Sequence, residues 1–321
     1  MGLILESRND ALGINGPMLG QQTLTTNGSN WFWAAFSVFA LSFLIVVAMS
    51  MRPRGGEKIF HYIFGITLLT GLIAYFAMAS GIGYRVVAQA NQLGRGLDRQ
   101  IYWPKYVFWV VAFPAIAMAV GLVSGVSWAT IFYYIALAWV WILCYLFAAF
   151  TTTNYKWGFF VFGTVAMAIL LLHLFWDGLR GSRRVGVTRD YTGIVAWTAL
   201  LWFLYALGWA LTDGGNRLGV VASFIWFGIL DILLIPVVAF LFLFRRWDYS
   251  NLNMHFTQYG RVARGGDYPE KGPAGSAPLG TTAQAPAAGV GPGAGAGTAT
   301  GAPGAPVTGP ADAPATAHQT V

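Results

Sequence analysis

Seven stretches of predominantly apolar residues follow one another along the chain, each about as long as a helix must be to cross a bilayer. They cover residues 31–50, 59–80, 106–123, 128–150, 157–176, 191–211 and 218–244. Turn residues predict loops between them, among them Gly94-Arg95-Gly96 and Asp213-Gly214-Gly215-Asn216. Because hydrocarbon offers no water to the backbone, a spanning segment must satisfy its own N–H and C=O groups, and a helix does so internally. The pattern predicts an all-α membrane protein, a bundle of seven transmembrane helices.

The charged residues agree with this fold class. They make up only 10% of the 321 residues, whereas soluble proteins carry roughly a quarter. The formal net charge is +7, but the basic residues gather in short connections beside apolar stretches, as in Arg52-Pro53-Arg54. Membrane topology and lipid headgroups account for basic residues placed there, so we expect no nucleic-acid partner. The lone Cys144 excludes a disulfide framework and a cysteine-based metal site.

The distribution of Lys and Arg predicts the orientation and the domains. The basic clusters that lie directly at helix ends favour one side of the bilayer, which we assign to the cytoplasm together with the C-terminus. We expect an extracellular segment over 1–30, a seven-helix domain over 31–247 and a cytoplasmic tail over 248–321. From about residue 265 the tail is rich in alanine, glycine and proline, a composition typical of disorder.

Four motifs on four of the expected helices resemble those of the microbial (type 1) rhodopsins. The third helix opens with Ile101-Tyr102-Trp103-Pro104-Lys105-Tyr106-Val107-Phe108-Trp109, and the second contains Tyr75-Phe76-Ala77-Met78-Ala79-Ser80-Gly81. The sixth carries Trp202, Tyr205 and Trp209 at the spacing of the family's retinal cage, and the seventh carries Leu230-Asp231-Ile232-Leu233-Leu234-Ile235-Pro236. The resemblance implies a bundle of microbial rhodopsin type.

One position departs from the family in a way that changes the chemistry. Ile235 stands where the motif places lysine, and only a primary amine condenses with an aldehyde to a Schiff base. The chain has four lysines, Lys58, Lys105, Lys156 and Lys271, and Lys105 occupies the family's arginine position. We therefore expect no covalent retinal and no other cofactor.

The resemblance also locates the positions that carry protons in the family. Phe108 occupies the place of the primary proton acceptor and Ala119 that of the cytoplasmic donor, and neither side chain ionises. Asp231 is then expected to be the one carboxylate along the pore. Proton pumping needs a series of ionisable groups, so this sequence does not predict a pump.

Asp231 is expected to lie in a polar network with Tyr75, Tyr205 and Lys105. Two interpretations are open: the network fixes the packing of three helices, or it is the remnant of a functional site and lines a ligand pocket. The vestigial pocket would consist of Trp109, Trp202, Tyr205, Trp209 and Asp231. Its aromatic residues pack the core or hold an apolar molecule, such as retinal, a lipid or a sterol, without a covalent bond.

Two histidines invite a metal or proton-relay interpretation. His61 and His173 lie on different expected helices, and we find no carboxylate three or four residues beyond either to complete a ligand set. The sequence therefore predicts no metal site.

A member without the lysine is similar to the fungal opsin-related proteins, which include the 30-kDa heat-shock membrane proteins. That resemblance implies a non-catalytic plasma-membrane protein linked to stress, which contacts membrane lipids and modulates the proton ATPase or protects membrane proteins. A homo-oligomer is compatible with it. The alternatives are a retinal-binding photoreceptor or light-driven ion transporter, and a passive pathway for ions or solutes.

Overall fold

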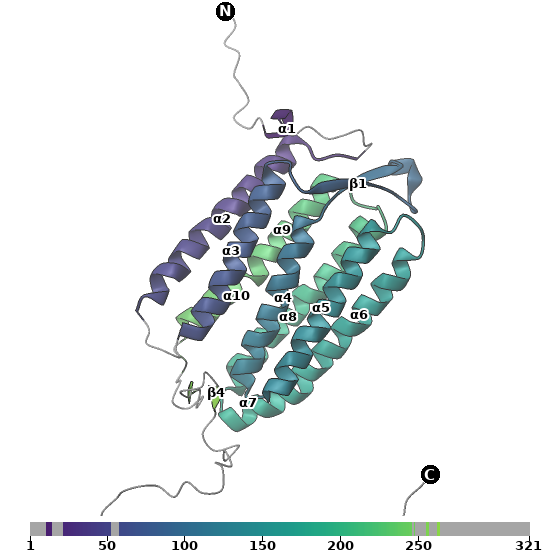
Figure 1. Ribbon diagram of the computed structural model, residues 1–321. Coiled ribbons are helices and arrows are strands. Elements are labelled where there is room, and N and C mark those ends of the chain that lie inside the picture. Colours follow the sequence, from purple (N-terminus) through teal and green to yellow (C-terminus); the bar gives the residue numbers. More distant parts are fainter. Residues whose placement is uncertain are drawn as a thin grey trace, which may run out of the picture. The chain divides into compact units, whose positions relative to one another are not determined.

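The computed structural model describes residues 11–14, 22–52, 58–245, 247, 255–256 and 262–263. Seven helical segments in this part of the chain are long and apolar enough to span a bilayer (Figure 1). Four are single helices: α2 (Thr26–Ser50), α3 (Ile59–Ala79), α4 (Pro104–Ser124) and α5 (Trp128–Phe150). The other three are composite: α6 (Lys156–His173) with η3 (Leu174–Gly178) and α7 (Leu179–Val185), α8 (Thr188–Trp209) with η4 (Ala210–Gly214), and α9 (Val220–Leu234) with α10 (Pro236–Phe244).

Local capping sets several of these helix ends. The hydroxyl of Thr25 accepts from the N–H of Gly28, so α2 begins at Thr26, five residues before the predicted start at residue 31. Ser127 caps α5 in the same way, by accepting from the N–H of Thr130. Gly125 ends α4 in the left-handed region, at a φ of 83°.

The fifth predicted segment also proved longer than expected. Its helix continues past residue 176 through the π-helical turn η3 to Val185. The basic residues Arg180, Arg183 and Arg184 therefore lie on a helix, not in a connection. Their charge breaks the apolar run without breaking the helix, which is why hydropathy alone placed the end too early.

Helices that follow one another along the chain pack as neighbours, and α9 closes the bundle by packing against both α2 and α8. The helix α4 contacts α3, α5, α7 and α8, and most of its side chains are buried. Large apolar side chains on the outside remain exposed, among them Leu41 at 62% and Leu172 at 68%. An exterior of this kind suits a hydrocarbon solvent.

A two-stranded β-hairpin, which was not predicted, covers one end of the seven-helix bundle between α3 and α4 (Figure 1). Strands β1 (Tyr84–Ala88) and β2 (Asp98–Tyr102) pair antiparallel, from Tyr84↔Tyr102 to Ala88↔Asp98, with the 3-10 turn η2 (Leu93–Arg95) between them. The β-branched Val86, Val87 and Ile101 are the sequence signal that the turn prediction at Gly94-Arg95-Gly96 left unused.

The remaining described elements are short: α1 (Ala11–Ile14), β3 (His255–Phe256) and β4 (Val262–Ala263), the last two paired antiparallel. The predicted disorder from about residue 265 lies outside the described residues, as does most of the 248–321 tail.

Candidate functional site

Asp231 lies in the last turn of α9, near the middle of the span that α9 and α10 form together, and is 1% exposed. Three donors converge on its carboxylate. Tyr205 and the indole N–H of Trp109 donate to Oδ1, over 2.5 and 2.9 Å, and Tyr75 donates to Oδ2 over 2.5 Å. The donors come from α3, α4 and α8, so Asp231 links four helices at one point.

The structure thus brings Asp231, Tyr75 and Tyr205 together, and it adds Trp109, which the sequence analysis had placed only in the pocket. Lys105 is the exception. Its ammonium group pairs with Asp213, over 2.5 Å to Oδ2, instead of with Asp231. The expectation that Lys105 joins the network around Asp231 is therefore wrong. Lys105 does lie beside that network, because its Nζ is 4.7 Å from the ring centroid of Phe227, which packs against Trp109.

The predicted pocket residues divide between two aromatic groups. Trp109 and Tyr205 lie beside Asp231 with their ring centroids 5.3 Å apart. Trp209 instead stacks on Phe160, at 5.0 Å, and its indole N–H donates to the hydroxyl of Tyr106 over 3.0 Å.

Phe113 occupies the space between Trp109 and Trp202. Its ring centroid lies 5.9 Å from each of them, and 5.0 Å from both Trp141 and Tyr205. Nothing in the sequence indicated a special role for Phe113. In the structure it is the residue that fills the predicted cage.

Ile235 follows Asp231 by one helical turn. Its backbone N–H donates to the carbonyl of Asp231 over 2.9 Å, and its side chain is fully buried. Pro236 comes next and separates α9 from α10. The position that the resemblance equates with the family's lysine therefore points a hydrocarbon side chain into the core. Phe108 and Ala119 are fully buried as well.

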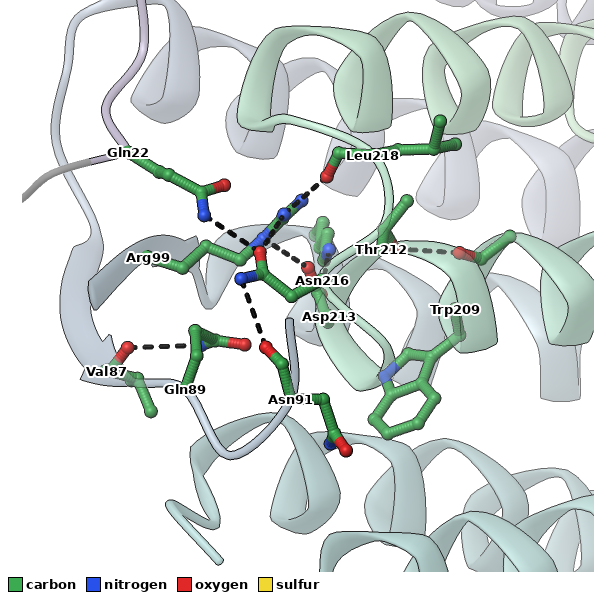
Figure 2. Close-up of polar contacts among 12 residues, drawn as sticks. Gln22, Val87, Gln89, Asn91, Arg99, Trp209, Thr212, Asp213, Asn216 and Leu218 are labelled. Atoms are coloured by element: carbon green, nitrogen blue, oxygen red, sulfur yellow. Dashed lines mark hydrogen bonds and ion pairs between the residues drawn. The ribbon is translucent and has the colours of Figure 1, made fainter. Parts of the chain in front are cut away.

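A second buried network surrounds Asp213, which the sequence analysis had assigned to a loop. Asp213 is the second-last residue of the π-helical turn η4, is 2% exposed, and faces the hairpin (Figure 2). Lys105 and the Tyr106 hydroxyl contact its Oδ2, at 2.5 and 2.7 Å, and Arg99 Nε lies 3.4 Å from Oδ1. Lys156 donates to its backbone carbonyl over 3.2 Å.

Asp213 is a second buried carboxylate, which lies at the hairpin end of the bundle and which the prediction of one carboxylate along the pore, Asp231, did not include. One feature of the sequence could have indicated that Asp213 is buried. It follows Trp209 by four residues, which puts both side chains on one face of a helix. The neighbouring Gly214-Gly215 outweighed that signal and favoured a turn. Two cations, Arg99 and Lys105, thus pair with the buried carboxylate of Asp213, and a third, Lys156, binds its backbone carbonyl. Burial lowers the pKa of the Arg99 guanidinium, and Asp213 opposes this shift.

The hairpin and the α8–α9 connection hold this network together. Asn216 is fully buried, and its Oδ1 accepts from Gln22 and from Arg99, over 3.0 and 3.3 Å. Arg99 also donates to the carbonyl of Leu218 over 2.6 Å. Figure 2 shows Gln22, Arg99 and Asn216 meeting between the strands and the helix end. These contacts close the hairpin end of the bundle with polar side chains.

One statement about the histidines was wrong. Asp177 lies four residues after His173, and its Oδ2 is 2.6 Å from the imidazole Nδ1. His61 lies on α3, whereas His173 is the last residue of α6. Across the described residues, no three His, Cys, Asp or Glu side chains are grouped so that they could hold a metal ion.

Comparison with known proteins finds one family and several relatives that match the seven-helix part of the chain. The model of the bacteriorhodopsin-like protein family matches residues 26–247. Protein FDD123 of Trametes versicolor is 38% identical over 78% of this chain and 89% of its own, and the opsin-like protein carO of Fusarium fujikuroi is 33% identical over 77% and 82%.

The chain is also similar to a heat shock protein and to a light-driven proton pump of known structure. The 30 kDa heat shock protein of Saccharomyces cerevisiae is 26% identical over 72% of this chain and 76% of its own. The crystal structure of LR (Mac), a light-driven proton pump from Leptosphaeria maculans, superposes with a TM-score of 0.67 at 28% identity, over 72% of this chain and 98% of that one.

Proposed function

Because this chain is a multi-pass membrane protein that belongs to the bacteriorhodopsin-like family, we propose that it is an opsin-related plasma-membrane protein that forms no retinal adduct. It acts through contacts with proteins or lipids. The family normally binds retinal, and its retinal-binding members are light-driven transporters, not enzymes.

The observation that carries the proposal is the side chain at position 235. Retinal is held by a Schiff base to a lysine amine in this family, and Ile235 offers a buried hydrocarbon there. The three lysines in the described part of the chain do not supply the missing amine. Lys105 and Lys156 both contact Asp213, and Lys58 lies at the start of α3. The residues present therefore do not fit a covalently bound retinal.

The packing around Phe113 also argues against retinal bound without a covalent bond. A flat polyene needs a slot between aromatic side chains, and the Phe113 ring lies between Trp109 and Trp202. The buried Phe108 and Ala119 further leave no ionisable side chain at the acceptor and donor positions. The Asp231 network then serves as a staple that fixes four helices.

The cellular role is proposed from the relatives. One of them is a 30 kDa heat shock protein, which favours a link to stress. A protein of this kind would modulate the plasma-membrane proton ATPase or protect other membrane proteins, with the N-terminus outside and the C-terminus in the cytoplasm. Affinity purification from native membranes, followed by mass spectrometry of proteins and lipids, would identify the partners. Recovery of neither a specific protein nor a specific lipid would contradict this role.

The alternative is a photoreceptor or light-driven ion transporter, favoured by the likeness to LR (Mac). The decisive test adds all-trans retinal to the purified protein and records the visible spectrum before and after borohydride reduction. We expect only the band of free retinal and no retinyl group on the protein. A red-shifted band, or a reduced adduct on any lysine, would establish the alternative.

A further inference from the structure

A groove opens between α2 and α3 near the ends that the 51–58 connection joins. It has a volume of about 320 Å³. Gly65 helps to create it, because a Cβ built on this residue meets no other atom within 4 Å. From α2 the groove is lined by Phe43, Val46, Val47 and Ser50, and from α3 by residues including Tyr62, Gly65, Ile66 and Leu69.

The lining changes in polarity along the groove. Ser50 and Tyr62 line the mouth of the groove, near the helix ends that the 51–58 connection joins. Phe43 and Leu69 are each seven residues further along their helix, which places them about 10 Å deeper. The deeper walls are hydrocarbon and aromatic. A groove of this kind, on a surface that faces lipid, suits an alkyl chain that enters from the membrane boundary.

Two basic residues, Arg52 and Lys58, lie close in the chain to the lining residues at the mouth of the groove, Ser50 and Tyr62. Lys58 has helical backbone angles, φ −80° and ψ −9°, and precedes Tyr62 by four residues, so both lie on one face of α3. Arg52 is exposed and follows Ser50 by two residues. In the sequence, the connection 51–58 carries Arg52, Arg54 and Lys58 against Glu57 alone. A negatively charged headgroup would be complementary to this mouth.

We propose that this groove binds an anionic phospholipid, with one acyl chain between α2 and α3 and the phosphate against Lys58 and Arg52. The expected orientation puts the mouth on the cytoplasmic side, where anionic lipids attract basic segments. The inference rests on the proposed function, in which the protein acts through lipid or protein contacts, and it names the lipid class and the surface.

The test uses the full-length protein, delipidated in detergent and titrated with dioleoyl phosphatidylserine, while native mass spectrometry counts bound lipids. Removing both charges, by Arg52→Gln with Lys58→Gln, should weaken phosphatidylserine binding about 25-fold, since each basic residue near a headgroup contributes about fivefold, or about 1 kcal/mol. Dioleoyl phosphatidylcholine should bind the wild type as weakly as phosphatidylserine binds this variant.

Two matched controls separate the groove from general effects. Arg183→Gln with Arg184→Gln removes two exposed charges from another helix end on the same side and should leave binding unchanged. Gly65→Leu fills the groove and should abolish binding of the acyl chain, whereas Gly193→Leu, also in open space near the start of a helix, should not.

Several outcomes would overturn the proposal. They are equal binding of phosphatidylserine and phosphatidylcholine, equal loss in the control pair Arg183→Gln with Arg184→Gln, and displacement of phosphatidylserine by ergosterol at equal concentration. Retained binding in Gly65→Leu would place the lipid elsewhere. None of these results bears on retinal, so a failure here leaves the spectral test of the proposed function intact, and a retinal adduct would overturn the function without changing the lipid titration.

Discussion

Lys105 and Asp213 form a buried ion pair at the hairpin end of the bundle, with 2.5 Å between Nζ and Oδ2. Lys105 lies at the start of α4 and Asp213 at the end of the α8–η4 segment, so the pair joins the ends of two helices. Arg99 and Lys156 bring two further cations to the same residue. Asp213 is therefore the side chain whose loss would leave the most buried charge without a counter-ion.

Asp213→Asn should lower the free energy of unfolding by about 3 to 5 kcal/mol, because breaking a buried ion pair leaves its partner uncompensated. Unfolding in detergent, followed by intrinsic fluorescence or circular dichroism, measures the change. Asp190→Asn is the control: it removes a carboxylate whose partner Arg245 is half exposed, and should cost at most about 1 kcal/mol. Equal effects of the two substitutions would show that the Asp213 network does not stabilise the fold.

Asp231→Leu should destabilise the protein through the three donors that it leaves without an acceptor, Tyr75, Trp109 and Tyr205. Hydrogen bonds within a membrane contribute about 0.6 to 2 kcal/mol each, so we expect a loss of about 2 kcal/mol or more. Asp231→Asn keeps one accepting oxygen and should lose less. The melting temperature measures both. A leucine variant as stable as the wild type would argue against the staple and for a ligand-binding role.

Ile235→Lys should restore the amine without restoring the slot, because Phe113 still lies between Trp109 and Trp202. We expect a weak visible band with all-trans retinal in Ile235→Lys and a much stronger one when Phe113→Ala is added. Phe113→Ala alone should give no adduct. If the double variant forms no more pigment than the single one, Phe113 is not what blocks the cage.

Gly181→Ala should destabilise the packing of α7 against α4. A Cβ at this position would lie 2.3 Å from the backbone carbonyl oxygen of Ser124, which cannot move without shifting α4. We expect a loss of more than about 1 kcal/mol, as is usual for overpacking. Gly158→Ala, where a Cβ meets nothing within 4 Å, should be neutral or gain up to about 1 kcal/mol from helix propensity. Thermal unfolding of both variants makes the comparison, and a stable Gly181→Ala would contradict it.

Hydropathy located all seven spanning segments, because twenty apolar residues in a row have few other stable arrangements. It failed where polar residues are buried by tertiary structure. Asp213 was placed in a loop because Gly214-Gly215 follows it, and Arg99 contributed only to the count of basic residues that predicts the orientation. Their burial depends on the hairpin folding over the helix ends, and no local pattern contains that contact.

The motifs located the Asp231 network more successfully, because helical spacing and the family resemblance fixed which side chains face one another. Tyr75 and Tyr205 lie where the resemblance puts them. Lys105 was misplaced because a long side chain at a helix start can reach either of two carboxylates, and only one of them had been considered. The partner of His173 could have been predicted, because Asp177 follows it by four residues and therefore lies on the same face of the helix.

The burial of two lysines also gives the protein a built-in chemical reporter. Lys105 and Lys156 are 2% and 1% exposed, whereas Lys58 is only partly covered. An amine-selective acylating reagent should modify Lys58 in the folded protein and reach Lys105 and Lys156 only when the hairpin end opens. The extent of acylation at these two positions, read by peptide mass, would follow opening of that end in intact membranes without any engineered label.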